Sequence, residues 1–127
     1  MNQKRANKCT GGPNLIFACS GAADVGEISD RAARNMSRDG VGKMFCLAGI
    51  GGRVPDIMKM TGTASNILAI DGCKLDCVKS CLQQAGFDQF EHFRVTDLGL
   101  QKGNTEVNNE NIAKVVTKGK ELMVSAV

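Results

Sequence analysis

Short apolar runs alternate four times with segments of helical periodicity, and no other feature of the sequence constrains the fold as strongly. The runs typical of buried strands are residues 15–19, 43–47, 66–70 and 90–95. The segments with helical spacing of apolar residues are 24–39, 55–61, 75–85 and the stretch that begins at Asn108 or Asn109. Because a helix must return the chain before the next parallel strand can begin, this alternation predicts a three-layer, Rossmann-like α/β domain. The expected sheet is four-stranded and mostly parallel, with helices on both faces.

A length of 127 residues leaves room for one compact domain of ordinary size. Residues 1–14 are polar and basic, and we expect them to form a flexible tail ahead of a single domain over residues 15–127. This stretch lacks the apolar central region that a secretory signal needs, so the sequence predicts a cytoplasmic protein. Cys9 lies in the expected tail and is not counted among the candidate site residues.

The charge balance gives little support for a nucleic-acid partner. Sixteen Lys and Arg against 13 Asp and Glu leave a net charge of +3, and the basic residues are scattered along the chain. The chain has no Trp or Tyr and five Phe, which leaves few side chains that could stack on bases. No apolar run reaches the length needed to cross a membrane, so a membrane partner is not expected either.

Six cysteines are unusual in so short a chain that is expected in the cytoplasm. Reducing conditions disfavour permanent disulfides there, so metal binding or redox chemistry is the expected use of these thiols. Cys19, Cys46 and Cys73 fall at or just after the ends of the first three predicted strands. Since the carboxyl ends of parallel strands share one edge, where ligands bind in such sheets, we expect these three thiols to gather there.

Two more cysteines extend the third one into a Cys-x3-Cys-x3-Cys pattern at the start of the third predicted helix. Helical spacing puts Cys81 beside the apolar stripe that begins at Leu75, so Cys81 is expected in the core, whereas Cys77 leans toward the strand ends. Four converging thiolates suit zinc in tetrahedral geometry. The predicted ligands of this zinc ion are Cys19, Cys46, Cys73 and Cys77. For the first two of these, ordinary burial as core cysteines is the alternative.

The remaining polar candidates are one histidine and two aspartates. His92 begins the fourth predicted strand, which would put it at the edge opposite the cysteines, so we expect it to be neither ligand nor base. Asp71 and Asp97 end the third and fourth strands at the functional edge, where each could orient a ligand or, more commonly, cap a turn or helix. Without a histidine near the thiols, a Cys-His acyl-transfer site is not expected, and no acid-base pair marks the chain as an enzyme.

Three motifs resemble a known family. They are Cys-Ser-Gly-Ala-Ala-Asp-Val-Gly at 19–26, Lys-Met-Phe-Cys-Leu-Ala-Gly-Ile-Gly-Gly-Arg-Val at 43–54 and Ile-Asp-Gly-Cys at 70–73. They look like the DGC-domain family, small prokaryotic proteins named for the triplet that stands here at 71–73. The resemblance continues through residues 95–99 and 110–112, and so covers the chain from about Leu15 to its end.

The resemblance implies zinc binding through cysteines that correspond to Cys19, Cys46, Cys73 and Cys77, in a family whose biochemical role is undefined. The sequence departs from the family at two places. Lys74 replaces a usual Pro, which puts a cation beside the thiols and would favour their thiolate form or compete with a metal. Glu106-Val107-Asn108 replaces a Pro-Val-Thr-like entry to the last helix and is expected only to weaken its cap.

Two alternatives to zinc binding stay open at this point. In the first, the chain is a thiol-disulfide enzyme in which Cys73 is the nucleophile and Cys77 or Cys81 resolves a disulfide, although the spacing is not the Cys-x-x-Cys of thioredoxin-like proteins. In the second, the same four thiolates hold an iron-sulfur cluster. A complete shell of four thiolates around zinc leaves no open position for water, so the zinc hypothesis predicts no hydrolytic activity.

Overall fold

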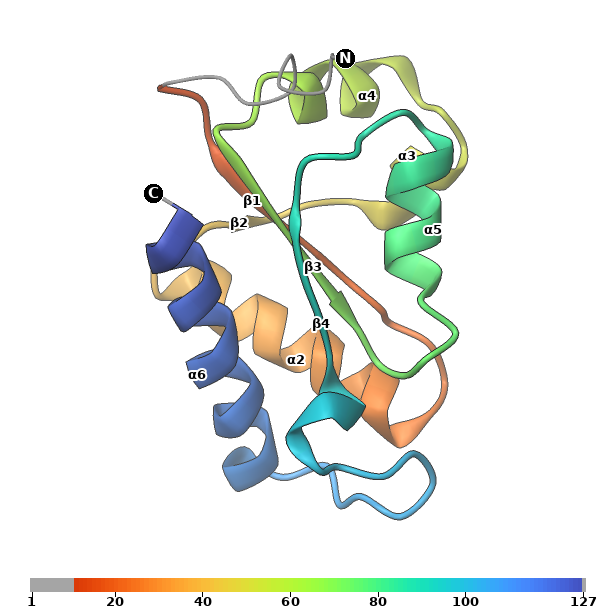
Figure 1. Cartoon of the computed structure of the whole chain (residues 1–127), viewed down its shortest axis with the longest axis vertical. Coiled ribbons are helices and arrows are strands. Elements are labelled where there is room, and N and C mark those ends of the chain that lie inside the picture. Colours follow the sequence, from red (N-terminus) through yellow and green to blue (C-terminus); the bar gives the residue numbers. More distant parts are fainter. Residues whose placement is uncertain (1–10, 127) are drawn as a thin grey trace.

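A computed structural model describes residues 11–126 and has one parallel sheet with helices packed on both faces (Figure 1). The strands are β1 (Asn14–Ala18), β2 (Lys43–Met44), β3 (Asn66–Asp71) and β4 (Glu91–Arg94). The helices are α2 (Asp24–Arg38), α3 (Leu47–Gly51), α4 (Pro55–Gly62), α5 (Cys77–Gln84) and α6 (Asn109–Ala126), with a short 3₁₀ helix η1 (Val95–Leu98). The predicted α/β class, the four strands and the helices on both faces are confirmed.

The four strands lie in the order β2-β1-β3-β4, and all three neighbouring pairs are parallel. From β1 the chain crosses over to β2 on one side, then passes back across β1 to β3 and continues outward to β4. Right-handed crossovers place helices on opposite faces when the direction of travel reverses. The reversal leaves a switch point between β1 and β3, the position at which open sheets of this kind bind ligands.

Each face of the sheet covers its own apolar core. Helices α2 and α6 cover one face of the sheet, and α3 and α5 cover the other (Figure 1). Along β1, Ile16 and Ala18 pack in the first of these cores, and Leu15 and Phe17 pack in the second. These four side chains are at most 4% exposed, as expected for a strand buried on both sides. Close approach of α6 also depends on Gly119, because a Cβ there would lie 2.7 Å from Met36 Sδ.

The segment after β2 differs from the expectation. Residues 43–47 read as a full strand, but β2 ends at Met44 and the glycine-rich stretch that follows forms helix α3. The carbonyl of Cys46 accepts hydrogen bonds from the backbone N–H groups of Gly49 and Ile50, which starts the first turn. A Cβ on Gly49 would lie 2.6 Å from Ile57 Cγ1, so the glycine is needed for α3 to pack against α4. This packing is a tertiary effect that overrides the low helix propensity of glycine.

The start of α5 also differs. Helical spacing predicted a helix that includes Leu75, but α5 begins two residues later and Leu75 is 66% exposed. Asp76 interrupts the helix here with a left-handed backbone conformation, at a φ of 55°. Val78 and Leu82 do lie in the core as predicted. The segment between β3 and α5 is therefore a tight loop that carries Cys73.

The ends of the chain bear on three further expectations. Of the predicted tail 1–14, Asn14 begins β1, and Cys9 lies outside the described residues. The last helix is capped, because Asn108 Oδ1 accepts the backbone N–H of Asn111 at 2.8 Å, so the departure from the family at this entry leaves a working cap. No helix in residues 11–126 combines the length and apolar character that a membrane span requires.

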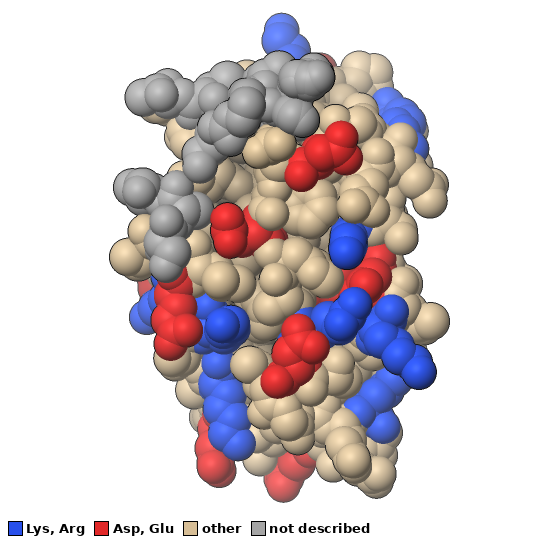
Figure 2. Space-filling view, viewed as in Figure 1, with Lys and Arg blue, Asp and Glu red and all other residues tan. Residues whose placement is uncertain are grey.

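On the face that carries β4, α5 and α6, positive and negative side chains are interspersed (Figure 2).

Candidate functional site

Three cysteines follow three neighbouring strands. Cys19 comes directly after β1, Cys46 comes two residues after β2, and Cys73 comes two residues after β3. The sheet order is β2-β1-β3-β4, so the three strands that precede these cysteines are neighbours. Because the strands are parallel, their carboxyl ends lie along the same edge of the sheet. The loops after β1 and β3 run next to each other (Figure 1). Cys19 donates its backbone N–H to the carbonyl of Ile70 at 2.9 Å. The periodicity of the sequence did not determine this adjacency.

Three glycines hold the loops of Cys19 and Cys73 together. A Cβ on Gly26, in the first turn of α2, would lie 2.7 Å from the carbonyl oxygen of Gly21. A Cβ on Gly72 would lie 3.2 Å from the backbone nitrogen of Gly26. The loop after β1, the start of α2 and the loop after β3 are thus in direct backbone contact, which fixes the two cysteine-bearing loops relative to each other.

Cys77, the first residue of α5, is close enough to the thiols of Cys19 and Cys73 for them to affect its pKa. Its side chain is exposed, but partial desolvation of the thiol raises its pKa, and the acidic groups of Cys19, Asp71, Cys73 and Cys81 raise it further. In the part of the chain that the structure describes, no three of these thiols lie within 4.8 Å of one another. Sulfurs around one zinc ion are about 3.8 Å apart, so the thiols would have to rotate inward to hold a metal.

Cys46 has a different environment. It is exposed and stands at the N-terminus of α3. Together with Cys81 it lines a groove of about 890 Å³ between α2, α3 and the segment after β2. Cys81 therefore shares the groove with Cys46, and it also belongs, with Cys19 and Cys73, to the groups that act on Cys77.

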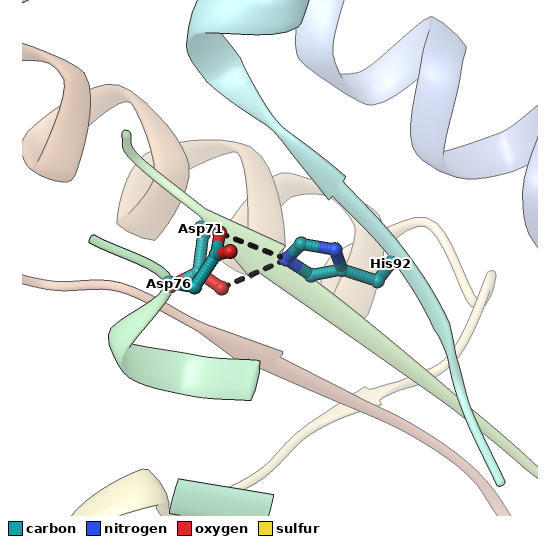
Figure 3. A group of neighbouring side chains, drawn as sticks. All are labelled: Asp71, Asp76 and His92. Carbon is teal, nitrogen blue, oxygen red and sulfur yellow. Dashed lines mark hydrogen bonds and ion pairs between the residues drawn. The ribbon is translucent and has the colours of Figure 1, made fainter. Parts of the chain in front are cut away.

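Asp71, the first residue of the Asp-Gly-Cys triplet, is 1% exposed, and both of its carboxylate oxygens accept hydrogen bonds. Its carboxylate accepts the backbone N–H groups of Val78 at 2.7 Å and Lys79 at 3.2 Å, and so caps α5 from the end of β3. The same carboxylate lies 2.9 Å from His92 Nε2 (Figure 3). Asp71 thus joins the thiol-bearing loop to both α5 and β4.

The far end of that loop is clamped by an ion pair. Both carboxylate oxygens of Asp76 accept hydrogen bonds from the Arg94 guanidinium at 2.7 Å. This bidentate pair holds the pKa of Asp76 below its ordinary value and raises that of Arg94. The strained left-handed conformation of Asp76 is therefore fixed by its side chain, and Cys73 lies in a loop anchored at both ends.

The predicted position of His92 is wrong. Because β4 is only four residues long, its second residue already pairs with Ala69 of β3, and the imidazole reaches the carboxyl end of the sheet. His92 Nε2 also lies 3.6 Å from Asp76 Oδ1, and the ring packs edge-on against Phe90. Sequence reasoning missed this contact because the length of β4 could not be determined from its pattern. The expectation of a capping role for Asp97 is met, since its carboxylate accepts the backbone N–H of Arg94 at 3.0 Å.

In residues 11–126, Asp71, Asp76 and His92 form the one group of three potential metal ligands within 4.8 Å (Figure 3). The Arg94 guanidinium occupies both oxygens of Asp76, and two backbone N–H groups occupy those of Asp71. The positive charge that a metal would provide is supplied by Arg94. We therefore interpret this group as a structural network that shapes the thiol-bearing loop.

Lys102 is a cation at the thiols that sequence reasoning missed. Lys102 Nζ lies 3.6 Å from Cys73 Sγ. The expected effect of Lys74, which is also exposed, stays a prediction. The loop that carries Lys102 is tied to the first residue of α2, because the Asp24 carboxylate accepts the backbone N–H groups of Gly103 at 2.9 Å and Thr105 at 3.0 Å. These hydrogen bonds, with that of Gly103 first, hold the pKa of Asp24 below its ordinary value.

The Asp76–Arg94 pair predicts a specific dependence of stability on pH. Since the pKa of Asp76 is lower in the folded state than its ordinary value of 3.8, the pair stabilises the fold above about pH 4. This stabilisation is lost as the pH falls through 3.8 toward the folded-state pKa. Urea denaturation between pH 3 and pH 6 is expected to show a smaller loss of stability for Asp76→Asn than for the native chain.

A charge-matched control is Asp88→Asn, since Asp88 is exposed and precedes β4. Its stability is expected to follow the native pH profile. Parallel profiles for Asp76→Asn and the native chain would contradict the assignment of this acid-sensitive contribution to the ion pair.

Comparison with known proteins identifies the family. The profile of the DGC domain matches residues 15–118. The protein belongs to the DGC-domain family. This DGC domain is also 36% identical, over 88 residues, to the anaerobic and virulence modulator AnvM of Pseudomonas aeruginosa. The aligned part covers 69% of this chain and 67% of AnvM. No solved structure matches the chain.

Each residue of the triplet that names the DGC domain has a distinct position in this structure. Asp71 caps α5 and contacts His92, and Gly72 allows the backbone to approach Gly26. Cys73 presents its thiol in the anchored loop beside Lys102. The resemblance inferred from the sequence is thus confirmed, and the triplet has a structural reason for its composition.

Proposed function

We propose that this DGC domain binds zinc through the thiolates of Cys19, Cys73 and Cys77, with Cys81 as the fourth ligand. The observation that carries the proposal is the backbone contact between the loops of Cys19 and Cys73, directly in front of the helix that starts at Cys77. Soft thiolates brought together at the switch point of a parallel sheet are the donor type that zinc prefers.

The electrostatics of Cys77 support a cationic ligand. Its pKa is raised by desolvation and by four neighbouring acidic groups, so the metal-free protein disfavours its thiolate. A dication among the same thiols reverses this effect, because a coordinating thiol loses its proton outright. Zinc binding is therefore expected to release protons and to strengthen with rising pH.

The choice between Cys46 and Cys81 as fourth ligand follows from their surroundings. Cys81 is half-buried, lies one turn after Cys77 on α5 and is one of the groups that raise the pKa of Cys77. Cys46 is exposed at the groove beside α2 and is not among those groups. Cys46, a ligand in the prediction from sequence, stays a prediction that the experiment below tests.

Zinc affinity measured by competition with a chromophoric chelator tests the proposal. Protein purified without oxygen or chelator is expected to contain about one zinc ion by elemental mass spectrometry. Cys77→Ser is expected to weaken zinc binding by about 100-fold or more, because it removes one of four thiolate bonds. Cys19→Ser, Cys73→Ser and Cys81→Ser are expected to behave alike.

Cys46→Ser is the matched control, since it removes an exposed thiol from the same edge of the sheet. Its affinity for zinc is expected to match that of the native chain. An equal loss in Cys46→Ser and Cys77→Ser would assign the fourth position to Cys46. Absence of bound metal, together with no uptake of added zinc, would refute the proposal. Bound iron with sulfide would replace zinc by a cluster, which visible absorbance detects.

A second candidate function is thiol-disulfide exchange at Cys73, and the observation that favours it is the contact with Lys102 at 3.6 Å. An ammonium group beside a sulfur stabilises the thiolate, which is the reactive form. The description of AnvM as an anaerobic and virulence modulator suits thiols whose state follows oxygen supply. A reversible disulfide between Cys73 and Cys77 or Cys81, found by titration with glutathione, would support this function over metal binding.

A further inference from the structure

Of the four proposed zinc ligands, Cys81 alone lines the groove beside α2. It has a volume of about 890 Å³ and lies at the carboxyl ends of β1 and β2. This volume is within the usual range for small-molecule sites, and the position is one that open parallel sheets use for ligands. Its lining is mostly apolar and includes Ala18, Met44, Phe45 and Leu47.

The charged groups at this groove favour an anion. Arg34 and Arg38 line it from α2, together with a single carboxylate, that of Asp30. That carboxylate is already engaged, because its two oxygens accept the Ser20 hydroxyl at 2.6 Å and Arg34 Nε at 2.8 Å. The two guanidinium groups therefore exceed the acidic charge by one, at the rim of an otherwise apolar surface.

The backbone at the groove disfavours an extended peptide. A peptide that adds to the edge of a sheet needs free donors on the outer strand. Met44 donates its N–H to Ser37 Oγ at 3.1 Å, and Phe45 donates its N–H inward to the carbonyl of Ile16 at 2.9 Å. A small molecule with an apolar body and an anionic group fits this lining better.

The thiols decide which small molecule is favoured. Cys46 is exposed and Cys81 is half-buried, and both line the groove. A ligand whose anionic group pairs with Arg34 and Arg38 would occupy the same groove as the Cys46 thiol. A thiol next to a bound disulfide reacts by exchange, without any further reactant.

We propose that the groove binds a low-molecular-weight anionic disulfide and that Cys46 forms a mixed disulfide with it. In this step the Cys46 thiolate attacks one sulfur of the ligand, and a new bond joins the two sulfurs. The ligand's own sulfur-sulfur bond breaks, and its other half leaves as a thiolate that takes up a proton. The Cys46 sulfur is oxidised and the departing sulfur is reduced, so electrons balance. This inference does not rest on zinc binding.

The test compares an anionic with a neutral disulfide on zinc-treated full-length protein. Oxidised glutathione and 2-hydroxyethyl disulfide are the probes, and peptide mass mapping locates the adduct and gives its rate of formation. We expect glutathione to attach at Cys46. The double variant Arg34→Gln/Arg38→Gln is expected to slow the reaction of oxidised glutathione by about tenfold, and that of the neutral disulfide by less than twofold.

The control is Arg31→Gln, which removes one positive charge from α2 at a residue that does not line the groove. It is expected to leave both rates unchanged. Equal slowing of both probes, or an adduct that forms elsewhere than at Cys46, would overturn the proposal. Protection of Cys46 by zinc would also overturn it and would instead make Cys46 a metal ligand. Unchanged zinc content in Cys46→Ser, with loss of the adduct, supports both proposals separately.

Discussion

Replacement of Asp71 by alanine is expected to lower the free energy of unfolding by about 3–5 kcal/mol, because it removes the acceptor of three hydrogen bonds at a buried site. The carboxylate is 1% exposed and accepts hydrogen bonds from Val78, Lys79 and His92. The buried N–H of Val78 would lose its acceptor outright, and Lys79 and His92 are only partly accessible to water that could replace theirs. Such a loss is a large part of the stability of a domain of this size, so partial unfolding at 25 °C is expected. Urea denaturation followed by circular dichroism measures the effect.

One further variant separates the charge of Asp71 from its shape, and another serves as a control. Asp71→Asn keeps one acceptor oxygen in place and is expected to be destabilised by less than Asp71→Ala. Asp97→Asn alters an exposed carboxylate that accepts a single backbone N–H, and it is expected to cost about 1 kcal/mol or less. A change of less than 1 kcal/mol for Asp71→Ala would contradict the role assigned to this network.

Replacement of Gly26 by alanine is expected to cost about 1–3 kcal/mol and to weaken zinc binding. The added Cβ would lie 2.7 Å from the carbonyl oxygen and 3.0 Å from the backbone nitrogen of Gly21. Both are backbone atoms, so the loop after β1 must move as a whole and carry Cys19 away from Cys73. Denaturation and chelator competition on the same preparation report the two effects.

Gly62→Ala provides the matched control. Gly62 is the last residue of α4, and a Cβ there would meet no atom within 4 Å. Alanine is favoured over glycine in a helix, so this variant is expected to be as stable as the native chain or up to about 1 kcal/mol more stable, with normal zinc affinity. Equal behaviour of the two variants would contradict the proposed contact between the loops.

The parts of the fold that sequence predicted well are those fixed by local pattern. The apolar runs of β1 and β3 pack on both faces of the sheet, and the spacing of Val25, Ile28 and Met36 identifies α2 because these residues form its buried side. Sequence did not predict α3 or the late start of α5. Both depend on tertiary contacts, namely the packing of Gly49 against Ile57 and the clamp on Asp76. Such contacts override local propensity.

In the candidate site, too, features fixed by local pattern could be predicted from the sequence, and features that depend on tertiary contacts could not. The ends of β1 and β3 could be located from the sequence, so Cys19 and Cys73 were correctly placed at one edge. Cys46 lies at the same edge although β2 ends earlier than predicted. The contact between His92 and Asp71 could not be predicted, because it depends on the length and register of β4. The same is true of Lys102, which lies 29 residues from Cys73 in the sequence and reaches it only through the loop bound to Asp24.

That loop has a consequence for access to the thiols. Residues 101–104 are exposed, and the contacts of this segment to the rest of the fold pass through a few hydrogen bonds to Asp24 and the approach of Lys102 to Cys73. Segments held by so few contacts open with much smaller free energies than the whole domain. Brief excursions of this loop would therefore uncover Cys73 while the sheet stays intact. The rate at which a bulky reagent reaches Cys73 would report these excursions, independently of the melting temperature of the domain.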